Sequence, residues 1–311
     1  MFIRQLEYLA TLAREKHFAR AAESCHVSQP ALSSAIRSLE KELGIMIVQR
    51  GRRFQGFTVE GERVLAWAQQ TLASLENMRE YASLSKASLS GTLRIGAIPT
   101  TMPVSSYLTA AVRQAHPGIR FVISSLSFEA IVAGLDQFEL DIGFTYLEDR
   151  TVEGFEALKL FEERYVLIAR RSDALPAEMT WEQAATLPLC LLTAKMRNRQ
   201  LIEAAFRSAG VKPHVVLEAD SLFALYAHVR EAGLYTIMPH SMLQFLDLTR
   251  VQCRPLMPAV TRSIGLIARN KPTFGPLAGA VVNVVRGLDL QGLFDASLAD
   301  ALALSIAAVR H

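Results

Sequence analysis

Apolar side chains recur at steps of three and four residues through residues 59–88, which contain no proline and a single glycine, Gly61. The seam comprises Leu65, Ala68, Leu72, Leu75, Met78 and Ala82. Charged residues such as Glu76 and Arg79 fall mostly off this line. The pattern predicts one long amphipathic helix with a narrow apolar stripe, which is typical of a helix that pairs with a second copy. A helix that packs on its own domain is the alternative.

Beyond residue 92, short runs rich in Val, Ile and Phe alternate with helical patterns. The predicted strands are residues 93–97, 120–125, 140–145, 165–169, 189–192, 215–218, 235–238 and 263–268. The predicted helices are residues 104–115, 130–138, 197–209 and 222–232. Repeated strand-then-helix order predicts parallel sheets covered by helices. Because roughly 220 residues are generous for one such sheet, we expect two linked α/β subdomains around a cleft, with a single larger domain as the alternative.

Residues 18–44 have the pattern of two short helices joined by a tight turn. Ser28 is a good N-cap, Pro30 falls in a first turn that tolerates its missing N–H, and Gly44 is a suitable helix stop. Ala21 and Ala22 are small enough for two helices to cross closely. The segment predicts a helix–turn–helix in a domain of short helices that ends, by residue 58, in a hairpin rich in glycine and arginine.

The second helix of this segment has one apolar face and one polar face. At about 100° per residue, Leu32, Leu39 and Leu43 fall on the side of Ile36. The opposite side suits the major groove, where hydroxyls bond to bases or phosphates and arginine bonds bidentately to guanine. The basic hairpin tip, residues 49–56, suits a wing that contacts the backbone or the minor groove. The candidate DNA contacts are Ser28, Gln29, Pro30, Ser33, Ser34, Arg37, Lys41, Arg50, Arg52 and Arg53.

The net charge of the 311-residue chain is concentrated at its N-terminal end. The whole chain has 33 Lys and Arg against 30 Asp and Glu, a net charge of +3. Residues 1–60 alone hold nine basic and six acidic residues, whereas residues 92–311 hold 21 of each. This asymmetry favours double-stranded DNA as the partner of the N-terminal region. Half of the residues are apolar, which excludes a disordered or collagen-like chain.

The sequence carries no familiar signature of catalysis or metal binding. It lacks GxSxG, GxGxxG, P-loop, HExxH and CxxC motifs, and its seven histidines have no ligand spacing. Cys25, Cys190 and Cys253 predict buried thiols in a reducing cytoplasm rather than a disulfide framework or a zinc site. Early charges argue against a signal peptide, and no apolar run approaches the roughly 18 residues of a membrane span. We therefore expect a cytoplasmic protein that uses no cofactor, metal ion or membrane and is not an enzyme.

At this point the chain resembles a known family, the LysR-type transcriptional regulators. The resemblance rests on LEYLATLAREKHFARAAESCHVSQPALSSAIRSLEKELG and RGRRFQGFTVEGERVL, and on the weaker landmarks GTLRIGA, LDIGFTYL and EAGLYTIMP. It covers roughly residues 1–290. One departure is Ile47-Val48, where the family usually has a Leu-Phe pair, and this difference bears on how the wing packs.

The resemblance implies an α+β multidomain chain. Residues 1–58 would form a winged helix-turn-helix DNA-binding domain, residues 59–91 a linker and dimerisation helix with a hinge, and residues 92–311 an effector-binding domain. The last would resemble periplasmic binding proteins, with the chain crossing twice between subdomain I, residues 92–161 plus 269–291, and subdomain II, residues 162–268. Residues 292–308 are expected to form a terminal helix docked on this domain, or an oligomer contact.

A ligand site is expected between the two subdomains, because the crevice of an open parallel sheet lies beyond the carboxyl ends of its strands. Several predicted strands end in hydroxyls next to a helix start, where free N–H groups attract anions. The candidate effector contacts are Thr100, Thr101, Ser125, Ser127, Thr145, Tyr146, Thr193, Met196, Asn198, Ser221 and Pro239. Helix capping is the alternative role of each Ser or Thr. The basic residues at 195–199 favour a small anion, most simply a carboxylate.

These expectations combine into a sequence-specific regulator that binds DNA as a homodimer or homotetramer and responds to a small-molecule effector. An enzyme with an α/β cleft, a ligand-binding module for transport and a nucleoid protein without sequence preference are the alternatives. The missing motifs oppose the first, and the DNA-reading segment opposes the second. The third is distinguished by whether Arg37 reads bases.

Overall fold

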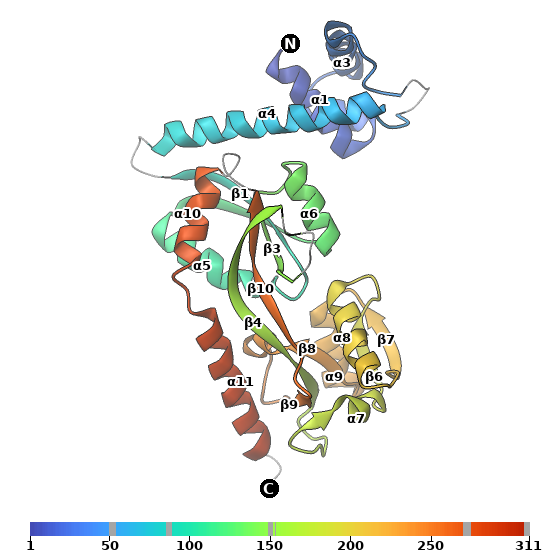
Figure 1. Cartoon of the computed structure of the whole chain (residues 1–311), viewed down its shortest axis with the longest axis vertical. Helices are drawn as coiled ribbons and strands as arrows, with labels where there is room; N and C mark the ends of the chain where they lie inside the picture. Colours follow the sequence, from blue (N-terminus) through green and yellow to red (C-terminus); the bar gives the residue numbers. More distant parts are fainter. Residues whose placement is uncertain (50–53, 85–88, 149–151, 153, 270–274, 308–311) are drawn as a thin grey trace. The chain divides into compact units, whose positions relative to one another are not determined.

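The computed structural model describes residues 1–49, 54–84, 89–148, 152, 154–269 and 275–307. The chain divides into two compact units, the first comprising residues 1–88 with the short segment Asp136–Glu139 and the second comprising the rest of the chain from Leu89 (Figure 1). Each unit has its own buried core, and each is described by itself.

Four helices form the first unit: α1 (Ile3–Glu15), α2 (Phe18–Ser24), α3 (Gln29–Leu43) and α4 (Val59–Leu84). Leu9 and Leu12 of α1 and Leu32 and Leu39 of α3 are completely buried in a shared core. The predicted ends of α3 are confirmed, because the Ser28 hydroxyl accepts a hydrogen bond from the Ala31 N–H at 3.3 Å and Gly44 adopts the left-handed conformation that ends the helix.

The long helix α4 divides into two parts along its predicted apolar seam. Leu65 and Ala68 are buried against the other helices of the unit. The first turns of α4 therefore pack on their own domain, which was the alternative to pairing with a second copy. Farther along, Met78 is 60% exposed and Tyr81 is 61% exposed. The side chain of Ala82, the last predicted seam position, lies outside the described residues. The second half of α4 therefore presents apolar side chains that the other helices of its unit leave uncovered.

The second unit is an α/β domain with a mixed sheet of eight strands (Figure 1). Its strand order is β2-β1-β3-β10-β4-β9-β5, with β8 paired to β4, and a small sheet pairs β6 with β7. The strands are β1 (Ser90–Ala97), β2 (Gly118–Ser125), β3 (Ile142–Tyr146), β4 (Phe155–Arg170), β5 (Met179–Thr180), β6 (Leu189–Leu192), β7 (Val215–Ala219), β8 (Thr236–Pro239), β9 (Val251–Met257) and β10 (Thr261–Arg269). The helices are α5 (Ser105–Ala115), α6 (Phe128–Asp136), α7 (Trp181–Ala185), α8 (Arg197–Ser208), α9 (Leu222–Ala232), η2 (His240–Phe245), α10 (Pro276–Val285) and α11 (Leu290–Ala307).

Two long antiparallel strands connect the two halves of this domain. β4 pairs with β10 through its first half and with β8 and β9 through its second half. We call the half containing β1–β3 subdomain I and the half containing β5–β9 subdomain II. The expected double crossing between the subdomains is thus made by β4 and β10. The strand-then-helix order predicted parallel sheets. This prediction is wrong for β4 and β10, which pair antiparallel to their neighbours.

The sequence pattern missed β5, β9 and the first half of β4. Residues 155–164 intersperse glutamates and lysine with apolar residues on a strand exposed along one side, so no apolar run marks them. β9 carries Gln252 and Arg254, both almost completely buried. Arg254 donates to the carbonyls of Pro176 at 2.8 Å and Cys253 at 3.0 Å, which satisfies a cation that hydropathy assigns to the surface.

The terminal helix α11 packs along both subdomains. Leu290 and Phe294 belong to the core of subdomain I, and Leu298 and Ala301 belong to a core of subdomain II. The predicted docked helix is therefore present, but its buried face differs from the predicted leucine pattern, since Leu293 and Leu304 are exposed. Within the described ranges no single helix is long and apolar enough to cross a membrane, although α10 and α11, bent by 46° at their junction, pass that test as a pair.

Candidate DNA-reading surface and effector cavity

The outer face of α3 carries the predicted DNA-reading side chains. Gln29, Pro30, Ser34, Arg37 and Lys41 are exposed, and Ser33 is half-buried on the flank. Ser28 is exposed as well, but its hydroxyl caps the helix. Leu43, predicted on the buried face, is 42% exposed because it lies in the last turn, beyond the reach of the core. One short helix thus presents hydroxyl, amide and cationic groups together, as insertion into a major groove requires.

The turn before α3 depends on a backbone feature that the sequence pattern missed. His26 adopts a left-handed conformation with φ of +54°. Such a conformation is uncommon for a residue with a side chain, and histidine tolerates it better than most. The Val27 N–H bonds to the Ala22 carbonyl at 3.0 Å across this turn. The turn fixes the angle between α2 and α3 and so the direction in which the outer face of α3 points.

The base of the predicted wing is firmly built. Val48 and Phe57 form an antiparallel bridge, and Glu40 of α3 accepts hydrogen bonds from the backbone N–H groups of Ile47 at 2.8 Å and Val48 at 3.0 Å. Ile47 is completely buried. The Ile47-Val48 pair, which stands where the family usually has Leu-Phe, therefore still packs in the core of this unit. The candidate contacts Arg50, Arg52 and Arg53 lie outside the described residues.

In the second unit, the parallel strands β1, β2 and β3 end at one edge of the sheet. Ala97 is in register with Ser125 of β2 and with Phe144 of β3. The segments that follow these strands lead into helices α5 and α6, while α8 of subdomain II begins at Arg197. Segments distant in sequence therefore meet where the two subdomains face each other.

A small cavity of about 10 Å³ lies at this meeting point, and we call it the inner cavity. It is lined by Ile98, Pro99, Thr100, Leu126, Ser127, Phe128, Tyr146, Met196, Arg197 and Asn198. The starts of α6 and α8 both contribute, and free N–H groups at helix starts attract anions. Thr100 is 1% exposed, and its hydroxyl lies beside the Tyr146 hydroxyl but makes no hydrogen bond of regular geometry among the described residues. In this conformation the cavity has room for about one water-sized group.

Five predicted effector contacts line the inner cavity: Thr100, Ser127, Tyr146, Met196 and Asn198. Ser127 also caps α6, because its hydroxyl accepts a hydrogen bond from the Ala130 N–H at 3.2 Å. It therefore serves as a helix cap as well as lining the cavity. Asn198 is buried, and its amide nitrogen lies 3.5 Å from the Tyr146 hydroxyl. This contact joins the end of β3 in subdomain I to the start of α8 in subdomain II.

Other predicted contacts fall elsewhere. Ser125 and Ser221 line a neighbouring groove, described below. Thr101, Thr145, Thr193 and Pro239 line neither cavity. The Thr101 hydroxyl donates to backbone carbonyls, those of Ile98 at 3.1 Å and Phe144 at 3.0 Å, so it holds the end of β1 against β3.

The basic segment before and within α8 contributes less charge than its sequence suggests. Arg199 is buried and bonds to the Leu192 carbonyl at 2.8 Å, to Glu203 and to Glu218 at 2.9 Å. These contacts fasten α8 to β6 and β7. Arg197 is the basic residue of this segment that lines the inner cavity.

A buried acid that the sequence pattern missed lies behind the inner cavity. Glu163 of β4 is completely buried, and its Oε1 accepts a hydrogen bond from the Tyr165 hydroxyl at 3.1 Å. Its Oε2 has no partner among the described residues. Burial raises the pKa of Glu163 to about 8, although the Tyr165 and Tyr146 hydroxyls pull it down. The carboxyl group is therefore mostly protonated at neutral pH, and burial also raises the pKa of Tyr146.

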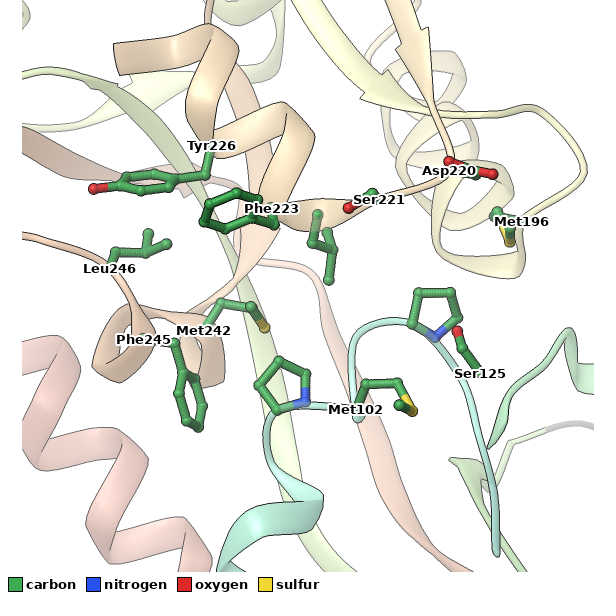
Figure 2. A pocket seen from close by; sticks show the side chains of 13 residues that line it. Met102, Ser125, Met196, Asp220, Ser221, Phe223, Tyr226, Met242, Phe245 and Leu246 are labelled. Atoms are coloured by element: carbon green, nitrogen blue, oxygen red, sulfur yellow. The ribbon is translucent and has the colours of Figure 1, made fainter. Parts of the chain in front are cut away.

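A larger, open groove of about 590 Å³ adjoins the inner cavity, and we call it the outer groove. Figure 2 shows its side chains. Its walls are mostly apolar and include methionines and aromatic rings; of these, the sequence analysis identified Met196 alone. They come from the segments after β1 and β2, from the starts of α8 and α9, and from η2. The start of α9 is capped by Ser221, whose hydroxyl accepts from the Ala224 N–H at 3.4 Å.

Comparisons with known proteins agree with both units. Residues 3–62 match the family model described as bacterial regulatory helix-turn-helix protein, lysR family, and residues 86–288 match the LysR substrate binding domain. The chain is 32% identical over 310 residues to the hydrogen peroxide-inducible genes activator of Haemophilus influenzae, an alignment that covers 94% of this chain and all of that protein.

Solved structures give the same result. A full-length OxyR variant from Pseudomonas aeruginosa superposes with a TM-score of 0.74 at 26% identity, covering 94% of this chain and 97% of that one. The LysR family regulator CbnR shares the fold, with a TM-score of 0.64 at 20% identity over 92% of this chain and 98% of that one. These matches identify a transcription regulator rather than an enzyme. The chain belongs to the LysR family of DNA-binding transcriptional regulators, with an effector-binding domain behind its helix-turn-helix.

Proposed function

We propose that this regulator changes its DNA binding in response to a small anionic molecule, most simply a carboxylate, held in the inner cavity between the two subdomains. The observation that carries the proposal is the buried Thr100 hydroxyl, which has the Tyr146 hydroxyl as a neighbour but makes no hydrogen bond of regular geometry among the described residues, at a cavity lined by the starts of two helices. A buried hydroxyl without a partner loses roughly 1–3 kcal/mol, which a bound oxygen atom would restore. Arg197 and the helix N–H groups supply positive potential for a negative charge.

A matched pair of variants tests this site. Thr100→Val removes the hydroxyl at nearly constant volume, and Thr145→Val does the same to a second buried hydroxyl that lines neither cavity. We expect small carboxylates to raise the melting temperature of the wild type and of the Thr145 variant, and to lose most of that effect in the Thr100 variant. Equal responses of the two variants would remove the inner cavity as the binding site.

Direct sensing of peroxide is the second candidate, because the Haemophilus influenzae relative is named a hydrogen peroxide-inducible genes activator and the inner cavity is small. The thiolate is the form of cysteine that reacts. Cys190 and Cys253 are buried, and burial raises the pKa of each thiol to about 11. Cys25 lies in the DNA-binding unit, and the residues lining the two cavities include no cysteine.

A disulfide between the two buried cysteines would require refolding. The strands lie in the order β9, β4, β8 and β6. Cys253 of β9 pairs with Ile168 of β4, and Ile168 pairs on its other side with Thr236 of β8. Cys190 belongs to β6, which lies beside β8 through the bridge between Leu189 and Tyr235. Three strand spacings separate the two cysteines by roughly 14 Å, about twice the Cα distance that a disulfide spans. We therefore expect peroxide to leave DNA binding unchanged, and a peroxide-induced shift in DNA retardation that is lost in Cys190→Ser would reverse this choice.

On the DNA side, we propose that the outer face of α3 reads bases and that the wing arginines bind the backbone. Arg37→Ala should lose about 1–3 kcal/mol on the specific operator and little on random DNA, so base discrimination falls. Arg52→Ala should weaken binding to both DNAs alike and reduce the salt dependence. Arg113→Ala, which removes an exposed charge on α5 of the second unit, is the control. Equal losses on both DNAs for Arg37 and Arg52 would instead favour a nucleoid protein without sequence preference.

We further propose a homodimer joined through the exposed second half of α4, with a tetramer formed through the effector domains, acting in the cytoplasm. The exposed Met78 and Tyr81 support a partner for this helix. Paired α3 helices would read half-sites about 34 Å apart or multiples of that spacing. Effector binding would then shift the arrangement of the DNA-reading units with a coupling of about 1–3 kcal/mol. The coupling must be reciprocal, so DNA that leaves effector affinity unchanged would contradict it.

A further inference from the structure

The side chains that line the outer groove are apolar at one end and mostly polar at the other. Figure 2 shows the Phe223, Tyr226, Phe245 and Leu246 side chains together at one end, and Ser125, Asp220, Ser221 and Met196 at the other. The Phe223 ring is 77% exposed and the Phe245 ring 39% exposed, although both stand at the groove. A concave site of this volume, mostly apolar with a few polar groups at one end, has the composition of a small-molecule site.

The polar end of the outer groove is the end next to the inner cavity. Pro99 and Met196 line both spaces. Met196 has an unbranched side chain with several rotatable bonds, so a change of rotamer can join the two spaces at little cost. The inner cavity in this conformation holds about one water-sized group, and displacement of Met196 supplies the additional room that a carboxylate needs.

Charge is sparse along this combined path. Arg197 at the inner cavity and Asp220 at the polar end of the outer groove are the charged residues that line it within the described part of the chain. An anionic group is therefore favoured beside Arg197, and a second negative charge is disfavoured at the aromatic end of the outer groove, where it would lose water without gaining a cationic partner.

We infer that the effector is an amphipathic monocarboxylate, whose carboxylate group occupies the inner cavity beside Thr100 and whose apolar tail, an alkyl chain or an aromatic ring, lies in the outer groove against Phe223 and Phe245. This inference rests on the proposed function, because it assigns the class of ligand for the same site. It extends the sequence-based expectation of a small anion by adding a tail of several carbon atoms.

The experiment titrates the full-length protein with butyrate, hexanoate and octanoate and measures affinity by calorimetry. We expect affinity to rise about fourfold for each methylene group that enters the groove, since each buried methylene contributes about 0.8 kcal/mol. Suberate, which has the length of octanoate and a second carboxylate, is expected to bind at least tenfold more weakly than octanoate.

Variants separate the tail site from the carboxylate site. Phe223→Ser should flatten the dependence on chain length and leave butyrate affinity nearly unchanged, and it should fold because the ring is exposed. Trp67→Ser removes an equally exposed aromatic ring on α4 and is the control that should change neither.

The outcomes distinguish this inference from the proposed function. If butyrate and octanoate bind equally and Thr100→Val weakens both, the carboxylate site stands and the tail site is wrong. If the acids do not bind, or bind equally well to Thr100→Val, both are wrong. If Phe223→Ser leaves the chain-length dependence intact and lowers self-association of the protein, the groove is an interface between copies and the inference is overturned.

Discussion

The DNA-reading surface and the effector cavity use similar side chains but are assembled in opposite ways. The first comes from one continuous stretch, α3 and its cap, in which helical periodicity alone decides which side chains face outward. The second is assembled from segments after β1, β2 and β3 and from the start of α8. Side chains at a helix surface follow from spacing in the sequence, whereas side chains at a meeting point of segments follow from the register between strands.

This difference explains which of the predicted effector contacts line the inner cavity and which do not. Placing hydroxyls at the carboxyl ends of parallel strands brought Thr100, Ser127 and Tyr146 to the cavity. Thr101, the next residue in the turn after β1, instead donates its hydroxyl to the backbone carbonyls of Ile98 and Phe144. Periodicity along the chain cannot decide which of two adjacent threonines faces the ligand.

The largest expected effect concerns Glu163, a residue on the cavity side that no motif marked. Its folded-state pKa of about 8 lies above the usual value of 4.5. The folded chain therefore binds more protons than the unfolded chain between these values, and the free energy of unfolding falls as pH rises through this window, by about 1.4 kcal/mol per pH unit. The stabilisation is fully present below pH 4.5 and is lost above pH 8.

Glu163→Gln keeps the shape and the acceptor for Tyr165 but cannot ionise. We expect denaturant unfolding between pH 5 and 8 to show a shallower loss of stability in this variant, which at pH 8 should exceed the wild type by on the order of 4 kcal/mol. Glu162→Gln changes the neighbouring exposed acid and should leave the wild-type slope intact. Parallel pH profiles for wild type and Glu163→Gln would contradict the prediction.

The next effect concerns Gly61, where α4 passes against the base of the wing. A Cβ atom at this position would lie 2.0 Å from the Ile47 carbonyl oxygen, so alanine must push the first turn of α4 away from the wing. We expect Gly61→Ala to lower the free energy of unfolding of the DNA-binding unit by about 3 kcal/mol and to weaken DNA binding.

Gly287→Ala is its control in the other unit, because the nearest atom to a Cβ there, the Val284 carbonyl oxygen, lies at 3.5 Å. Urea denaturation of both variants measures the difference. An equal free energy of unfolding in the two alanine variants would show that the base of the wing can shift without a loss of stability.

The sequence predicted the features that depend on neighbouring residues and missed those that depend on distant partners. The cap at Ser28, the stop at Gly44 and the span of α9 follow from neighbouring residues and were predicted correctly. The first half of β4 and the buried Arg254 depend on partners distant in sequence, and the buried Glu163 lies beside Tyr146 of another strand. Their polar side chains suggest the surface, and only the partners that satisfy them make burial possible.

The smallest effect compares the two regions with a matched substitution. Ser28 caps α3 and Ser221 caps α9, with hydroxyl-to-nitrogen distances of 3.3 Å and 3.4 Å. Replacing either by alanine should cost about 1 kcal/mol of helix stability. Because the same loss shifts the melting temperature more in a small unit, we expect about 4–8 °C for Ser28→Ala in the DNA-binding unit and about 2–4 °C for Ser221→Ala in the larger one.

Function should divide along the same line. Ser28→Ala should weaken operator binding and leave octanoate affinity unchanged, because α3 faces DNA alone. Ser221→Ala should weaken octanoate binding at the polar end of the outer groove and leave DNA binding without ligand unchanged. Calorimetry and DNA retardation on both variants measure the four quantities. If either variant alters both activities equally, the two regions are not independent sites, and the coupling between them extends to the helix caps themselves.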